Sequence, residues 1–172
     1  SYTVLYFSRN GEGVAPPDAH PPQALTVTST HDLAPLAGYW AERDLAIMHE
    51  LGTLPDEDAF QTACVQRARD KADWFAALKK AGCLAADEAL PPALTDALRS
   101  AIHRFGAQGA GRLYAVQIEN LLPVFDNFNV PGVAEGYPNW ACRLPSDIED
   151  FDQQPPLAAA LAMIKEKKKK KN

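Results

Sequence analysis

Residues 24–33 read ALTVTSTHDL, a stretch whose strand-forming half runs directly into a polar half. Residues 24–28 combine apolar and β-branched side chains and predict a short buried strand. Residues 29–32 place two hydroxyls, an imidazole and a carboxylate at the carboxyl end of that strand. Polar groups at this end of parallel strands are where barrel enzymes keep their chemistry. The stretch therefore predicts both a parallel fold and the place of its site.

Two other segments have the composition of strands. Residues 3–7 (TVLYF) and residues 112–118 (RLYAVQI) are rich in β-branched and aromatic side chains. A proline- and glycine-rich loop over residues 11–23 separates the first strand from the second. Between the second and third strands, apolar residues recur at helical spacing. Three helices are predicted there, at about 33–51, 55–80 and 92–105.

The chain continues irregularly after the third strand. Residues 106–111, which contain three glycines, are expected to break the third of these helices. A long aromatic-rich loop is predicted over residues 124–144, since a loop of that composition is usually functional or covers a core. A short helix from Pro145 and a last helix over residues 155–167 complete the expected order.

Alternating strands and helices indicate parallel βα units. Three strands are too few for a free-standing parallel sheet, because both outer strands would be unprotected edges. We therefore predict an α/β fold, the C-terminal portion of a (β/α)8 TIM barrel comprising about its last three βα units. Residues 1–164 would form this barrel part, and residues 165–172 a Lys-rich disordered tail. Because the chain opens inside a strand without an initiator Met, we expect a fragment of a longer protein.

The charge distribution narrows the class of ligand. The chain has 17 basic and 22 acidic residues, and six of the basic ones are lysines within residues 165–171. The rest of the chain is therefore strongly acidic, which argues against binding of nucleic acid. A neutral polyol or sugar fits this balance better. The apolar runs are far shorter than the roughly 20 residues needed to cross a bilayer, so no membrane partner is expected.

Cysteine and histidine spacing gives no sign of a metal site or of a disulfide framework. Cys64, Cys83 and Cys142 are an odd set without a CxxC pair, which suits reduced, structural thiols and a cytoplasmic location. Of the four histidines, His31 alone has polar neighbours worth weighing. We expect no metal and no cofactor.

His31 and Asp32 are the sharpest candidates for chemistry. A carboxylate at the mouth of a strand can stabilise developing positive charge, and an adjacent imidazole can donate to a substrate hydroxyl. The alternative is structural, because aspartate commonly caps the helix that follows it. Glu119, at the end of the third strand, is a second candidate carboxylate, with binding of backbone donors in the loop as its alternative.

Amides and aromatic rings are interleaved in the loop over residues 124–144. Amides reach hydroxyls while rings cover the apolar face of a pyranose, so the pairing suits sugar recognition. Turn chemistry is an equal alternative, because asparagine, proline and glycine are what tight loops need. Trp40 and Trp74, by contrast, lie on helical faces and are predicted core residues.

The sequence resembles one known family in several blocks. Residues 27–40, VTSTHDLAPLAGYW, resemble the STHDLPTLAGWW segment of 4-alpha-glucanotransferases, also called amylomaltases or disproportionating enzymes. Residues 129–133 (NVPGV) and 135–140 (EGYPNW) resemble the NxPGT and EHPNW stretches of that family, and an Arg-Leu-Pro follows at residues 143–145. The order and approximate separation of the blocks agree, and the similarity extends from about residue 2 to residue 151.

The resemblance implies retaining glycosyl transfer on a (β/α)8 barrel without metal or cofactor. One carboxylate attacks the anomeric carbon and a second protonates the leaving oxygen, the two lying roughly 5 Å apart. The third acidic residue of the family falls on Asp32, and His31 is expected to bind sugar hydroxyls. Asn129 and Trp140 are implied substrate-binding residues. The expected partners are α-1,4-glucans and maltooligosaccharides.

Departures from the family pattern set limits on this inference. Ala34-Pro35 replaces the usual Pro-Thr. Gly136 replaces the usual His and Ala141-Cys142 stands where basic residues are common, so the sequence departs from the family between residues 136 and 142 but keeps its pattern at His31 and Asp32. The nucleophile and the acid/base lie on earlier strands in the family, so this chain alone is expected to be inactive. The resemblance places the family in the alpha-amylase superfamily, and two alternatives stay open: a hydrolase of that superfamily, in which water is the acceptor, and a non-catalytic carbohydrate-binding remnant.

Overall fold

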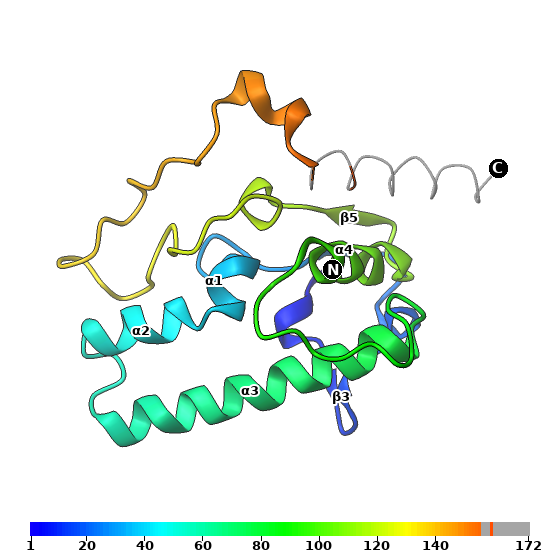
Figure 1. Cartoon of the computed structure of the whole chain (residues 1–172), viewed down its shortest axis with the longest axis horizontal. Coiled ribbons are helices and arrows are strands. Elements are labelled where there is room, and N and C mark those ends of the chain that lie inside the picture. Colours follow the sequence, from blue (N-terminus) through cyan, green and yellow to red (C-terminus); the bar gives the residue numbers. More distant parts are fainter. Residues whose placement is uncertain (156–158, 160–172) are drawn as a thin grey trace.

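The computed structural model describes residues 1–155 and 159 and is built around a three-stranded parallel sheet (Figure 1). Its strands are β1 (Tyr2–Val4), β4 (Leu25–Val27) and β5 (Leu113–Ala115), in the order β1-β4-β5. Each strand pairs in parallel with the next one along the chain. Strands added in sequence order on one side are what a (β/α)8 barrel requires, whereas the strand order of a doubly wound sheet reverses.

The two faces of the sheet have different surroundings. Thr26 is 1% exposed, and its register partner Tyr114 packs against the hydrophobic core beneath the helices. Because alternate residues point to opposite faces, the neighbouring positions Tyr2, Leu25 and Leu113 share the other face. Tyr2 and Leu113 are 56% and 64% exposed there. In a closed barrel this second face is the inner one, which side chains of the other strands fill.

The connections between strands differ in kind. β1 leads to β4 through short elements: the 3-10 turn η1 (Leu5–Phe7), the hairpin β2 (Arg9–Asn10) and β3 (Gly13–Val14), and the 3-10 turn η2 (Pro17–Ala19). β4 leads to β5 through the helices α1 (Leu36–Trp40), α2 (Arg43–Glu50), α3 (Glu57–Lys80) and α4 (Asp96–Gln108). After β5 come η3 (Ile118–Asn120) and η4 (Ile148–Gln153).

The two long helices carry clear start signals. The carboxylate of Asp56 accepts the backbone N–H of Ala59 at the beginning of α3, and the hydroxyl of Thr95 accepts that of Leu98 at the beginning of α4. Acidic side chains in the first turn of α3 and lysines in its last turn complement the helix dipole.

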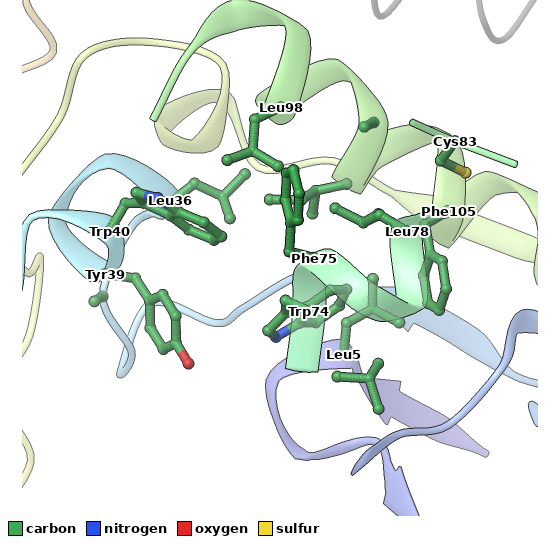
Figure 2. Close-up of a cluster of buried hydrophobic side chains, with 14 residues drawn as sticks. Leu5, Leu36, Tyr39, Trp40, Trp74, Phe75, Leu78, Cys83, Leu98 and Phe105 are labelled. Atoms are coloured by element: carbon green, nitrogen blue, oxygen red, sulfur yellow. The ribbon is translucent and has the colours of Figure 1, made fainter. Parts of the chain in front are cut away.

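One hydrophobic cluster joins α3 and α4 to the sheet (Figure 2). Trp74 of α3 meets Phe105 of α4 edge to face, with ring centroids 5.6 Å apart. Leu5 enters from the end of β1, and Trp40 from α1. Trp40 and Trp74 are 3% and 2% exposed, which confirms their predicted place in the core.

The outer strands are shorter than the sequence predicts. Of the first predicted strand, residues 3–7, only Thr3 and Val4 lie in β1, because Leu5 turns into the core and the N–H of Ser8 bonds back to the carbonyl of Leu5. The third strand ends at Ala115, since the N–H of Asn120 closes a 3-10 turn on the carbonyl of Gln117. The loop predicted over residues 11–23 contains half of the β2–β3 hairpin and the turn η2.

The predicted helix boundaries also need correction. The helix expected over 33–51 is split into α1 and α2 because Glu42 adopts the left-handed conformation, with φ of 60°. The break expected at Gly106 is wrong, because α4 continues through it to Gln108. Gly106 is needed for contact instead: a Cβ there would lie 2.4 Å from Cε2 of Tyr114. The short helix expected from Pro145 is the 3-10 helix η4, which begins at Ile148.

Two expectations fall on the end of the chain. The predicted helix over residues 155–167 and the Lys-rich tail at 165–172 lie almost wholly outside the described residues. Within the described part, no helix has both the length and the apolar character needed to span a membrane.

Candidate active site

The candidate site lies where β4 ends and the chain turns toward α1. Thr28 and Ser29 are 0% and 1% exposed, and the backbone then rises to the surface. The N–H of Asp32 donates to the hydroxyl of Thr30 over 3.3 Å, and the N–H of Leu33 donates to the carbonyl of Thr30 over 3.0 Å. This tight turn brings His31 and Asp32 out of the buried strand end.

Asp32 is the centre of a polar cluster. Its Oδ1 accepts a 2.6 Å hydrogen bond from Nδ2 of Asn129, and its Oδ2 lies 3.4 Å from Nε2 of His31. The side chain of Asp32 is 44% exposed and that of His31 is 59% exposed. The carboxylate is therefore held on two sides and open to a ligand on the remaining one.

Trp140 completes the cluster from the far end of the long loop. Its ring lies 5.1 Å from the ring of His31, with the planes tilted by 45°. The residue is 64% exposed and adopts a left-handed backbone, with φ of 63°. A bulky residue in this conformation is uncommon and is held here by its N–H, which donates to the carbonyl of Phe128 over 2.8 Å. The four predicted site residues are thus brought together.

Two asparagines of this loop bond different partners. Asn139 serves the turn: its Oδ1 accepts from the N–H of Val130, and its Nδ2 donates to the carbonyl of Val133. Asn129 instead faces Asp32. Tyr137 fixes the loop further by donating its hydroxyl to the carbonyl of Asn127, and burial raises the pKa of Tyr137 to about 12.

The helix-capping alternative for Asp32 is wrong. α1 begins at Leu36 with Pro35 as its N-cap residue, and no side chain of that N-cap bonds the helix. The first helical N–H, that of Leu36, donates to Oδ1 of Asn120 over 2.9 Å. Asp32 is therefore available for another task.

Sequence reasoning missed the residue that does the capping. Asn120 follows β5 and is 0% exposed, and its side chain also bonds Ser29 beneath the site. The sequence carries little sign of this role, since Asn120 ends the mixed run Gln117-Ile118-Glu119-Asn120 before two leucines. Glu119 beside it, which the sequence singled out, is only partly buried.

The described residues contain no group of three or more His, Cys, Asp or Glu side chains that could hold a metal ion. The three cysteines, all within the described part, are free thiols. Burial raises the pKa of Cys83 and of Cys142, which makes both weaker nucleophiles. The side chains that the site brings together are a carboxylate, an amide, an imidazole and an indole.

Comparison with known sequences decides the family. The family model described as 4-alpha-glucanotransferase matches residues 1–149. This chain belongs to the 4-alpha-glucanotransferase family. The resemblance found in the sequence motifs is thereby confirmed.

Curated 4-alpha-glucanotransferases of two bacteria illustrate the relationship. The protein of Haemophilus influenzae is 37% identical over 148 residues, which are 84% of this chain and 21% of that protein. The protein of Mycobacterium tuberculosis strain H37Rv is 36% identical over 122 residues, 70% of this chain and 16% of that protein. The chain thus spans about a fifth of the length of the curated 4-alpha-glucanotransferases it matches.

A solved structure shows the same fold. The crystal structure of amylomaltase from Corynebacterium glutamicum superposes with a TM-score of 0.84 and 22% identity, covering 94% of this chain and 25% of the other. The predicted fold class, an α/β fold that is part of a (β/α)8 barrel, is confirmed. In this chain the carboxyl ends of the parallel strands lie on the side of the sheet where His31 and Asp32 emerge.

Proposed function

We propose that this chain contributes to the active site of a 4-alpha-glucanotransferase that moves α-1,4-glucan segments to another glucan or to glucose by a retaining mechanism. One observation carries the proposal: Asp32 stands at the carboxyl end of a parallel strand, hydrogen-bonded by Asn129 and beside His31. Membership of the family and the barrel fold make this the expected position of a catalytic carboxylate.

Retaining transfer has two steps. A nucleophilic carboxylate bonds to the anomeric carbon while an acid/base carboxyl gives its proton to the leaving oxygen. The acceptor hydroxyl then attacks the same carbon, returns a proton to the acid/base residue and frees the nucleophile. Both steps pass through an oxocarbenium-like transition state. In this proposal the fixed negative charge of Asp32 stabilises that state, because a charge held in place needs no reorganisation as the reaction proceeds.

The neighbours of Asp32 have complementary roles in this proposal. Asn129 holds the carboxylate in one orientation. His31 donates to a hydroxyl of the sugar at the cleavage point, and its exposed side chain beside Asp32 supports that assignment. Trp140 presents an exposed aromatic surface next to His31, on which the apolar face of a glucose ring can stack.

The rest of the machinery belongs to other strands in this proposal. The nucleophile and the acid/base would lie upstream of residues 1–164, taken as the C-terminal part of the barrel, so this chain alone would be inactive. The exposed Tyr2 and Leu113 on one face of the sheet support this, because a closed barrel would cover them. A cytoplasmic location, suggested by the three free thiols, belongs to the same proposal.

The proposal is tested with the full-length protein that contains this chain, incubated with maltotriose. We expect glucose together with longer glucans, and we expect Asp32→Asn to lower kcat roughly 10³-fold or more, because it removes the charge that meets the transition state. Asp126→Asn is the matched control, since Asp126 is 54% exposed and pairs with Arg43 on the outside of α2.

Other outcomes would support one of the two alternative functions, a hydrolase or a non-catalytic carbohydrate-binding remnant. Hydrolysis products without longer glucans would mean that water is the acceptor. Binding of maltooligosaccharides without turnover would favour the non-catalytic remnant, and full activity of Asp32→Asn would remove Asp32 from the mechanism.

A further inference from the structure

Asn120 is the most completely engaged buried polar side chain near the site. It follows β5 in the turn η3 and is 0% exposed. Its Oδ1 accepts the N–H of Leu36 over 2.9 Å, and its Nδ2 donates to Oγ of Ser29 over 3.0 Å and to Oε1 of Gln117 over 3.1 Å. Both protons of the amide and its oxygen are therefore used within the protein, which leaves Asn120 nothing to offer a ligand.

The partners of Asn120 bracket the candidate active site. Ser29 is the last buried residue after β4, and Leu36 is the first residue of α1. Residues 30–35, which include His31 and Asp32, form the loop between these two positions. One side chain from a third segment thus fixes both ends of the loop that carries the proposed catalytic carboxylate.

Asn120 is itself held by a buried arginine. Nη1 of Arg99, on α4, donates to the carbonyl of Asn120 over 2.8 Å and to the carbonyl of Leu122 over 3.2 Å. Arg99 is 6% exposed. Gln117 adds a second connection, because its Nε2 donates to the carbonyl of Ser29. Arg99 therefore links the connection between β4 and α1 to helix α4.

We propose that Asn120 is a positioning residue for glucan transfer, which sets the place of Asp32 by holding Ser29 and Leu36 at a fixed separation. The inference rests on the proposed function. The backbone N–H groups of Asp32 and Leu33 both bond back to Thr30, so the turn itself is local and its position depends on how its ends are held. Asn129, bonded to Asp32, and the hydroxyl of Tyr6, which donates to the carbonyl of Ala34, support the loop from other sides. A displacement of about 1 Å at a catalytic group can cost 10²-fold in rate.

The test compares Asn120→Ala and Asn120→Asp with wild type in the full-length protein. We expect Asn120→Ala to lower kcat for maltotriose disproportionation about 100-fold while KM changes less than about threefold, since Trp140 lies on another loop and the charge of Asp32 acts on the transition state more than on the bound substrate. Hydrogen exchange in peptides covering residues 29–36 should become faster, because the N–H of Leu36 loses its acceptor. Asn120→Asp keeps that acceptor and should recover at least about a tenth of the wild-type kcat.

A control variant in another buried cluster distinguishes a loss of stability from a loss of positioning. Asp44→Asn weakens a buried hydrogen-bonded pair between α2 and α3, where Asp44 binds Arg67. We expect it to lower Tm at least as much as Asn120→Ala does, but to leave kcat unchanged. Equal kcat losses in the two variants would overturn the positioning role.

Two further comparisons keep the inference separate from the proposed function. If Asp32→Asn inactivates the enzyme while a folded Asn120→Ala keeps its kcat, the positioning role is wrong and the proposed function stands. If Asp32→Asn is fully active, both fail. If Asn120→Ala does not fold, Ser29→Ala is the alternative variant. It removes only the hydrogen bond between Asn120 and Ser29 and changes a small side chain. An approximately tenfold lower kcat at constant KM supports the inference there, and an unchanged kcat overturns it.

Discussion

The positive charges of two buried arginines, Arg67 on α3 and Arg99 on α4, are compensated in different ways. Both are less than 9% exposed. Arg67 donates to both carboxylate oxygens of Asp44, over 2.9 and 2.7 Å. Arg99 donates to the carbonyls of Asn120 and Leu122 instead. Arg67 also donates to the carbonyl of Tyr39, but its charge is balanced by the carboxylate of Asp44, whereas Arg99 is hydrogen-bonded by peptide carbonyls.

The difference shows in the proton affinity of the two groups. Burial alone would lower the pKa of Arg67, but the hydrogen bonds and charge of Asp44 raise it overall. Burial lowers the pKa of Arg99, and the carboxylate of Asp96, 3.7 Å from Nε and 73% exposed, offsets this only in part. The comparison teaches that the ion pair joins two helices, while the carbonyl-bound arginine fixes backbone positions beside the candidate active site.

The largest expected effect comes from removing the counterion of Arg67. Asp44→Ala leaves a buried guanidinium without its partner and should destabilise the protein by about 3–5 kcal/mol. Urea unfolding followed by fluorescence of Trp40 and Trp74, both in the core, measures this. The double variant Asp44→Ala with Arg67→Met should recover much of the loss, because no charge is then left buried. A loss below about 1 kcal/mol in the single variant would mean that Asp44 is not needed to neutralise Arg67.

The second largest expected effect is a loss of stability in acid, caused by a buried histidine near Arg99. His103 lies one helical turn after Arg99, is 1% exposed and shares a 2.8 Å hydrogen bond between its Nδ1 and Oη of Tyr114. Burial, assisted by the charge of Arg99, lowers the pKa of His103 to about 4. The neutral imidazole is thus the form that the folded protein accepts.

The sign of the pH dependence follows from this depressed pKa. Above the unfolded-state pKa of about 6.5, both states carry a neutral His103 and nothing is lost. As the pH falls from there toward the folded-state pKa of about 4, the unfolded chain binds the proton and stability declines. Between pH 7 and pH 5 the loss from this group should be about 2 kcal/mol.

Urea titrations at the two pH values measure the effect. His103→Gln, which keeps a polar group near Tyr114, should reduce the decline by that amount. An equal decline in wild type and in His103→Gln would assign the acid sensitivity to other groups.

The sequence predicted the exposed half of the site better than the buried half. His31 and Asp32 were predicted from their place at a strand end, and the resemblance to the family added Asn129 and Trp140. All four meet in space. Such residues are easy to identify in a sequence because a loop residue has no regular place in the core that would account for its type. Their roles in catalysis and binding remain predictions.

The buried half was missed for a physical reason. Asn120 and Arg99 are polar residues within apolar surroundings, and periodicity reports which face is buried but not which polar groups pair across it. The pairing depends on contacts between positions 21 and 84 residues apart, from Arg99 to Asn120 and from Leu36 to Asn120. The split between α1 and α2 was missed likewise, because the left-handed turn at Glu42 has no glycine to mark it.

A third arginine, exposed rather than buried, gives the smallest expected effect and sharpens the comparison. Arg43 on α2 pairs with Asp126 over 2.8 Å and with Glu50 over 3.1 Å, and its side chain is 38% exposed. Water screens these pairs, so Asp126→Asn should cost roughly 0.5 kcal/mol, and 1 M salt should abolish most of that difference. Urea unfolding of both proteins at low and high salt measures it. A loss above about 2 kcal/mol that persists in salt would show that exposure does not separate this arginine from Arg67, because an ion pair open to water cannot contribute so much.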